Sequence, residues 1–243
     1  MPNLPTHIRI SWEVAIQLEN STIFDNLGMY LLGSTSPDIR AMTKESRQQY
    51  HFAPLDFDEI GKGVDNMLKL YPQLSNLPNG NTTAAFIAGY ISHIVLDECW
   101  IKTMFRPLFG NGNNVSNLIN DRALQLEMDK SSSMISKEAI QHIANIQDLP
   151  VPGFIPAKTI LDWKQWVSNF LNRDFTWERL RFMAQRISMG DQSHAAHKVA
   201  DKFLKDMPGS LNNLLKQLPG DNLANFETFT KQKIKKTLNG YLL

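Results

Sequence analysis

His93 and Asp97, a histidine and an aspartate four residues apart, are the pair in this chain whose spacing best suits chemistry. They lie in a run from Thr82 to Phe105 that is rich in apolar residues and has few helix breakers. On a helix, side chains four residues apart share one face, so the imidazole and the carboxylate would be neighbours. Because a carboxylate buried without a partner is costly, the pair predicts either a metal ion or a buried hydrogen-bond network.

Three further residues near the start of the chain, His7, Asp38 and His51, could complete a metal site with this pair. Three imidazoles and two carboxylates form a mixed nitrogen and oxygen set of the kind that zinc accepts, and one carboxylate could bridge two ions. The spacing alone leaves a second interpretation open. A histidine followed four residues later by an aspartate often occurs by chance, and a lone histidine on a helix is commonly a structural group.

The pattern of apolar residues predicts an all-α fold, because they recur at helical spacing and nowhere alternate as in a half-buried strand. We expect one core over residues 1–243, with the proline-rich stretch 149–156 as an internal loop. Residues 39–57 look irregular. Helices are expected at about 6–19, 23–32, 56–70, 82–105, 120–146 (one helix or two), 158–172, 176–206 (continuous or broken at Gly190), 209–218 and 221–239.

The bulk composition is that of an ordinary soluble protein, with 243 residues, 42% apolar and 20% charged residues and a net charge of +1. A net charge of +1 gives the protein no overall positive field, which argues weakly against nucleic-acid binding driven by electrostatics. The first residues do not form a secretory signal, and no uninterrupted apolar run reaches the roughly 20 residues of a membrane span. We therefore expect a cytoplasmic protein without a membrane span. Cys99, the one cysteine, excludes an intrachain disulfide.

Four segments of the first 107 residues share their order and local context with a known family: Pro5–Ile8, Gly33–Arg40, His51–Phe52 and Ala88–Trp100. They resemble the zinc-dependent phospholipase C family, which is related to the S1/P1-type nucleases. The resemblance implies an all-α, phospholipase C/P1 nuclease-like domain with a metal site among its helices. It also implies hydrolysis of a phosphoester by attack of a zinc-bound hydroxide. The substrate would be a phospholipid, a nucleotide or a small phosphoester.

The resemblance also assigns the metal ligands. Positions that match Asp38, His51, His93 and Asp97 bind one zinc ion in the family pattern. The position of Asp97 also bridges to a second zinc ion, which the histidine matching His7 and the N-terminal residue hold. We therefore expect one or two Zn²⁺ ions, or another divalent metal, at these residues.

Two carboxylates are the predicted catalytic residues. Asp38 is either a metal ligand alone or also the base for the attacking water. Glu98 follows Asp97 and points about 100° away from it on a helix. It could act as a general acid or base, or form a salt bridge with a residue such as Arg106.

A later acidic group, Asp121, Glu127 and Asp129, is explained by ion pairs along a helix with Arg122 and Lys130.

The chain departs from the family pattern at two places. In the family pattern the N-terminal metal ligand lies further ahead of the first histidine, whereas only six residues precede His7 here. In addition, no histidine lies between His93 and His142, where the family has a ligand of a third metal site. His142, or the set His194, His197 and Asp201 on one helical face, could replace the missing ligands or form an ordinary polar surface. Two alternative functions follow. One is a biosynthetic metalloenzyme that uses the ion as a Lewis acid, and the other is a non-catalytic helical protein with a structural metal site.

Overall fold

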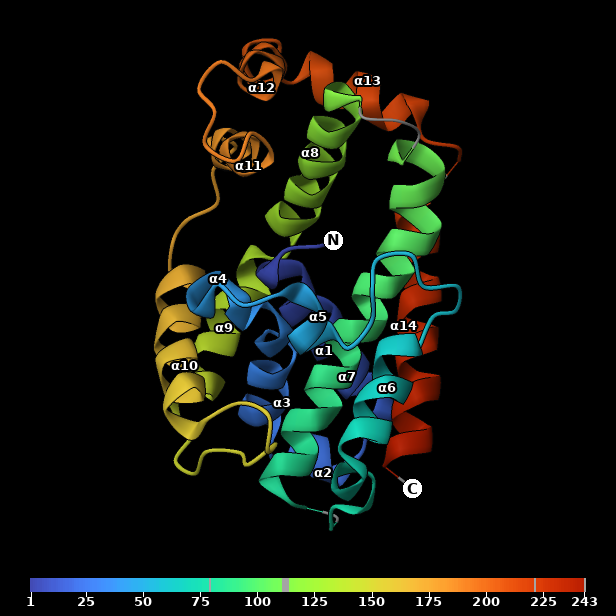
Figure 1. Ribbon diagram of the computed structural model, residues 1–243, viewed down its shortest axis with the longest axis vertical. Coiled ribbons are helices and arrows are strands. Elements are labelled where there is room, and N and C mark those ends of the chain that lie inside the picture. The colour runs from blue at the N-terminus through green and yellow to red at the C-terminus, as the bar shows by residue number, and fades with distance from the viewer. Residues whose placement is uncertain (79, 111–113, 221, 243) are drawn as a thin grey trace.

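The computed structural model describes residues 1–78, 80–110, 114–220 and 222–242, and every regular element in this part of the chain is helical. The all-α expectation is thereby confirmed (Figure 1). The α-helices are α1 (Leu4–Leu18), α2 (Ser21–Phe24), α3 (Leu27–Gly33), α4 (Arg40–Thr43), α5 (Arg47–His51), α6 (Lys62–Leu70), α7 (Thr82–Trp100), α8 (Val115–Ser131), α9 (Ser133–Ala144), α10 (Ala157–Leu171), α11 (Arg179–Ile187), α12 (Ala195–Lys205), α13 (Gly209–Gln217) and α14 (Asn222–Tyr241). Two 3₁₀ helices, η1 (Ser36–Ile39) and η2 (Pro72–Asn76), and a π-helix, η3 (Ile101–Phe109), complete the elements.

Helix α7 is the central element of the fold. Asn81 caps its first turn by accepting hydrogen bonds from the backbone N–H groups of Thr83 and Ala84. Every residue from Thr83 to Trp100 is buried. A helix that is apolar on all sides must be surrounded by other elements, and α1, α3, α6 and α14 pack around α7 (Figure 1).

The helical path of α7 continues directly into η3, whose wider turns accommodate Pro107 within the helix. The combined helix from Thr82 to Phe109 is long and apolar enough to cross a membrane, although the sequence had predicted no such span. Its most apolar stretch is entirely buried inside the protein, as is usual for a core helix. The apolar run is therefore explained by packing among the surrounding helices.

Helices α3 and α7 approach each other so closely that glycine is needed at their contact. A Cβ atom on Gly89 would lie 1.9 Å from the carbonyl oxygen of Tyr30, and one on Gly33 would lie 2.0 Å from that of Phe86. Both distances are far below any real contact between a Cβ atom and an oxygen. The two glycines thus bring the backbones together, and they fix where the segment after Gly33 lies relative to α7.

The structure selects between the alternatives left open for two segments and corrects the expectation for a third. Residues 120–146 lie in two helices, α8 and α9, which meet at Ser132. The segment expected over 176–206 is interrupted between α11 and α12, where Met189 and Gly190 have positive φ angles of 50° and 91°. Residues 39–57, which looked irregular, contain the short helices α4 and α5. The other expected helices are present with ends shifted by a few residues, except that 23–32 is divided between α2 and α3.

One cluster of buried apolar residues includes members from α1 through α14. Helices α11 and α12 pack on α8 at the upper end of Figure 1, and α13 lies beside α12. That residues 1–243 form one domain stays a prediction.

The contact between α3 and α7 predicts that Gly89→Ala destabilises the protein. The added methyl group has no room against the Tyr30 carbonyl, so the two helices must separate, and we expect the free energy of unfolding to fall by about 2–3 kcal/mol. Urea denaturation measures the change. Gly240→Ala in α14 is the matched control, because no atom lies within 4 Å of its added Cβ, and it should change stability by less than about 1 kcal/mol. A Gly89→Ala protein as stable as the control would contradict the close contact.

Candidate metal centre

His93 and Asp97 lie one turn apart on α7 and are both completely buried. The Nδ1 atom of His93 lies 2.8 Å from the backbone carbonyl oxygen of Ser34, which can only accept a hydrogen bond, so Nδ1 carries the proton. The lone pair of Nε2 is then free, and this atom lies 3.7 Å from Oδ2 of Asp97. The Ser34 carbonyl thus holds the imidazole in the tautomer that can bind a metal.

His7 reaches the same place from the first turns of α1. Its ring stacks on that of His93, with ring centroids 3.7 Å apart and planes within 5° of parallel. Its Nε2 atom lies 3.4 Å from Oδ1 of Asp97. His7 therefore approaches the carboxylate oxygen that His93 does not.

His51 is the last residue of α5, and its Nε2 atom lies 3.1 Å from Oδ2 of Asp97. Two features hold it there. The hydroxyl of Tyr90 on α7 donates a hydrogen bond to the backbone carbonyl of Tyr50. Phe52 adopts a left-handed conformation, with φ 56°, and ends the helix immediately after His51. A non-glycine residue rarely adopts this conformation, so the surrounding structure must enforce it.

All five predicted ligands meet in two overlapping groups. His7, His93 and Asp97 place one ligand atom each within 4.8 Å of one another, and so do Asp38, His51 and His93. Asp38 comes from η1 and is half-buried, whereas the other four are buried. The two oxygens of Asp97 face different histidines, an arrangement that suits a carboxylate bridging two ions. The ligand roles themselves stay predictions.

The donor atoms fit a metal ion because the protein leaves them unpartnered. His7 Nε2, His51 Nε2, His93 Nε2 and Asp97 Oδ1 are buried, and none has a hydrogen-bond partner with acceptable geometry. Buried polar atoms normally have such a partner, and leaving one unpaired costs about 1–3 kcal/mol. Imidazole nitrogens and a carboxylate oxygen are ligands that zinc binds in proteins. One bound cation would satisfy several of these atoms together.

The protonation states of His7, His51 and Asp97 also suit a metal. Burial lowers the pKa of His7 to about 4, with a further contribution from the charge of His93, and burial lowers the pKa of His51. Burial alone would raise the pKa of Asp97 and lower that of His93. Their mutual attraction, together with the contacts of His51 and His7 with Asp97 and of Asp38 and the Ser34 carbonyl with His93, moves both pKa values the other way. Asp97 is therefore ionised, and His7 and His51 are neutral, which are the forms that bind a metal, whereas the raised pKa of His93 means that a metal would have to displace a proton from its ring.

Arg47 is a residue at this site that the sequence reasoning missed. Its Nη2 atom lies 3.3 Å from Oδ2 of Asp97, and its Nη1 atom donates a hydrogen bond to the carbonyl of Ala53. It lies one turn before His51 on α5. This spacing of four residues is a helical signal, but the composition of residues 39–57 predicts an irregular segment, so the sequence does not point to Arg47.

Glu98 is directed toward the start of α6. Its two carboxylate oxygens accept hydrogen bonds from the backbone N–H groups of Gly61 and Gly63. The alternative salt bridge with Arg106 does not form, because Arg106 donates to the carbonyls of Leu55 and Phe57. The structure gives Glu98 a positioning contact, and its catalytic role stays a prediction.

The later histidines do not join the two ligand groups. His142 is exposed and contacts Trp12 with its ring. His194 caps α12 by accepting a hydrogen bond from the backbone N–H of Ala196. His197 contacts the Ser188 hydroxyl, and Asp201 pairs with Arg181 on the surface. Within the described residues, none of these four completes a third metal site.

The acidic residues of α8 are more buried than the sequence interpretation assumed. Asp121 pairs with Arg122 as expected, but it is fully buried and also accepts a hydrogen bond from the indole of Trp100. Asp129 forms no ion pair among the described residues and instead accepts hydrogen bonds from Asn3 and Thr6. The eight-residue spacing of the two aspartates places them on one face of α8, which was the missed signal.

Residues 6–100 match a protein-family model described as zinc dependent phospholipase C. The match extends from the first turn of α1 to the end of α7 and contains all five predicted ligands. No curated protein and no solved structure matches the chain. The matched family is zinc dependent, and the His/Asp groups of this chain can hold a metal ion.

We predict that the purified protein binds at least one equivalent of zinc and that His93→Ala lowers the affinity more than about 100-fold, because His93 belongs to both ligand groups. Elemental analysis gives the stoichiometry, and competition with a chromophoric chelator gives the affinity. His197→Ala is the matched control and should bind zinc like the unaltered protein. Less than one equivalent of metal, unchanged by His93→Ala, would contradict the metal centre.

Proposed function

We propose that the protein is a metal-dependent hydrolase of phosphoesters, because residues 6–100 match the family model described as zinc dependent phospholipase C. One observation carries the proposal. The segment that matches the family buries three imidazoles against one carboxylate and leaves their binding atoms unpartnered.

We assign the ligands by the oxygen of Asp97 that each histidine faces. His51 and His93 face Oδ2 and, with Asp38, would hold one ion. His7 faces Oδ1 and would hold a second ion that Asp97 bridges. A bound zinc ion lowers the pKa of a coordinated water and neutralises charge on phosphoryl oxygens.

Asp38 marks the side from which substrate would arrive. It is half-buried, whereas His7, His51, His93 and Asp97 are at most 1% exposed. A carboxylate at this boundary can accept the proton that the attacking water loses, in addition to any role as a ligand. We therefore propose Asp38 as the general base.

Arg47 would bind the phosphoryl group. Its guanidinium contacts Asp97 Oδ2, and its own side chain is 13% exposed. A divalent cation on Asp97 would neutralise that carboxylate and leave Arg47 with N–H groups available for an anion. Arginine binds phosphoryl oxygens by strong, charge-assisted hydrogen bonds. Arg47 thus supplies a positive charge beside the proposed metal site.

The depth of the ligands favours a small phosphoester or a lipid head group over a long nucleic acid. Four of the five ligands are buried, and the chain has a net charge of only +1. The second candidate function is a metalloenzyme that uses the ion as a Lewis acid on another small molecule. The absence of a third ligand group among the described residues supports this alternative.

We expect the zinc-loaded protein to hydrolyse at least one substrate of a panel made of bis(p-nitrophenyl) phosphate, phosphatidylcholine vesicles and nucleoside monophosphates. Asp97→Asn should lower kcat/KM more than about 100-fold, since it removes the one charge shared by both proposed ions. Asp201→Asn on α12 is the control and should retain activity. A protein that binds zinc and hydrolyses none of these substrates would favour the Lewis-acid alternative.

Arg47→Ala should lower kcat/KM about 10- to 100-fold while the zinc content stays the same, because a hydrogen bond to a charged group contributes about 1.5–3 kcal/mol. Inhibition by inorganic phosphate should weaken in parallel. Arg47→Lys keeps the charge and should recover part of the loss. Lys62→Ala, at an exposed position at the start of α6, is the control. Unchanged phosphate inhibition in Arg47→Ala would contradict a role in binding the anion.

A further inference from the structure

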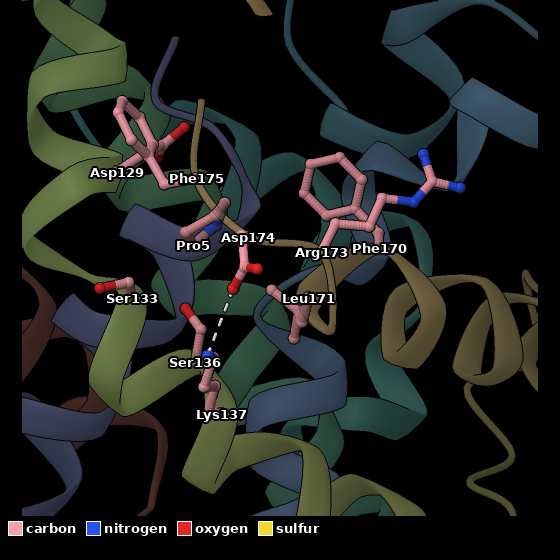
Figure 2. A pocket seen from close by; sticks show the side chains of 10 residues that line it. All are labelled: Pro5, Asp129, Ser133, Ser136, Lys137, Phe170, Leu171, Arg173, Asp174 and Phe175. Carbon is pink, nitrogen blue, oxygen red and sulfur yellow. Dashed lines mark hydrogen bonds and ion pairs between the residues drawn. The ribbon is translucent and has the colours of Figure 1, made fainter. Parts of the chain in front are cut away.

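A cavity of about 290 Å³ lies between the start of α1, the junction of α8 with α9, and the end of α10. Figure 2 shows the side chains that line it. The metal ligands are not among them. The cavity has room for about ten non-hydrogen atoms, if each takes the volume of one water molecule. Its walls combine apolar groups, among them Pro5, Leu171 and Phe175, with a buried carboxylate, Asp129.

Asp129 lacks a cationic partner. It is 3% exposed, and its two oxygens accept one hydrogen bond each, from the Asn3 amide and the Thr6 hydroxyl, both at 2.8 Å. No lysine, arginine or histidine nitrogen among the described residues lies within 4 Å of it. Burial raises its pKa to about 6, against the opposite effects of the hydrogen bonds from Thr6 and Asn3 and of the more distant charge of Arg179, so it is still ionised at neutral pH. A buried carboxylate with only neutral donors is an incompletely compensated charge.

The cations that line the cavity are engaged elsewhere. Lys137 pairs with Asp174 at 3.4 Å, and both side chains are exposed. The guanidinium of Arg173 points away from Asp129 (Figure 2). The buried end of the cavity therefore has negative charge, and among the described residues no cation contacts it, the charge of Arg179 acting on Asp129 only from a longer distance.

We propose that this cavity binds a small organic ammonium ion, a primary amine on an apolar body, with Asp129 as its counter-ion. A carboxylate offers about four acceptor positions, and Asp129 uses two, so an ammonium group can donate to the remaining ones. The apolar body would pack against Phe175, Leu171 and Pro5. A neutral or anionic ligand of the same shape leaves the charge uncompensated. The site is separate from the metal centre and does not depend on the proposed hydrolysis.

The test compares 2-phenylethylamine with 2-phenylethanol, which have the same number of non-hydrogen atoms and differ in charge. Calorimetric titration of the zinc-loaded protein should show millimolar binding of the amine and at least ten-fold weaker binding of the alcohol. Asp129→Asn should weaken amine binding at least ten-fold. Met134→Ala, at a side chain of α9 that is 84% exposed and outside the cavity, is the control and should bind normally.

A second variant keeps the test decisive if Asp129→Asn does not fold. Ser133→Phe fills the cavity from an exposed position and leaves the hydrogen bonds of Asp129 in place, so it should abolish binding. Equal binding of amine and alcohol would overturn the proposal. So would normal amine binding in a folded Asp129→Asn or Ser133→Phe protein. Amine binding that disappears when zinc is removed would locate the amine at the metal and would also overturn the proposal.

Discussion

The burial of Asp97 inside α7 is the constraint on which the site depends. Its carboxylate is 1% exposed in a helix that is apolar on every side, and such a charge must be balanced nearby. Arg47 and the imidazoles of His7, His51 and His93 converge on its two oxygens. The helices α1 and α5 therefore bring polar groups into the core where Asp97 of α7 requires them. Helix α7 is therefore both the central helix of the fold and the element that carries His93 and Asp97 of the candidate site.

The precision of the site comes from backbone packing. Gly33 and Gly89 let α3 and α7 touch through their main chains, and the next residue after Gly33 presents its carbonyl to His93. Tyr90 then holds α5 through the carbonyl of Tyr50. These contacts stiffen the frame around the ligands, so the histidines keep their positions through the fold itself. Preorganised ligands of this kind bind an ion without a costly rearrangement.

The features that the sequence predicted well are those with a local signature. The all-α fold, the helix carrying His93 and Asp97, and the gathering of His7, Asp38 and His51 beside it follow from periodicity and from a family pattern. The rest depends on tertiary packing. Arg47 lies in a short helix that neighbouring elements stabilise, and the burial of Asp129 results from contact with the first turn of α1, 123 residues away along the chain. The spacings that accompany them, Arg47 four residues before His51 and Asp121 eight residues before Asp129, do not by themselves show which groups these side chains meet.

The carbonyl that orients His93 belongs to the main chain, and this has a consequence for mutational robustness. The hydroxyl of Ser34 donates to the carbonyl of Leu31 and takes no part in the contact with His93. Position 34 is fully buried, and another small residue there that keeps the path of the chain would present the same acceptor. Position 33 has no such freedom, because any side chain there meets the backbone of α7. The tautomer of His93 thus depends on the path of the main chain, and substitution is restricted more strictly at position 33 than at position 34.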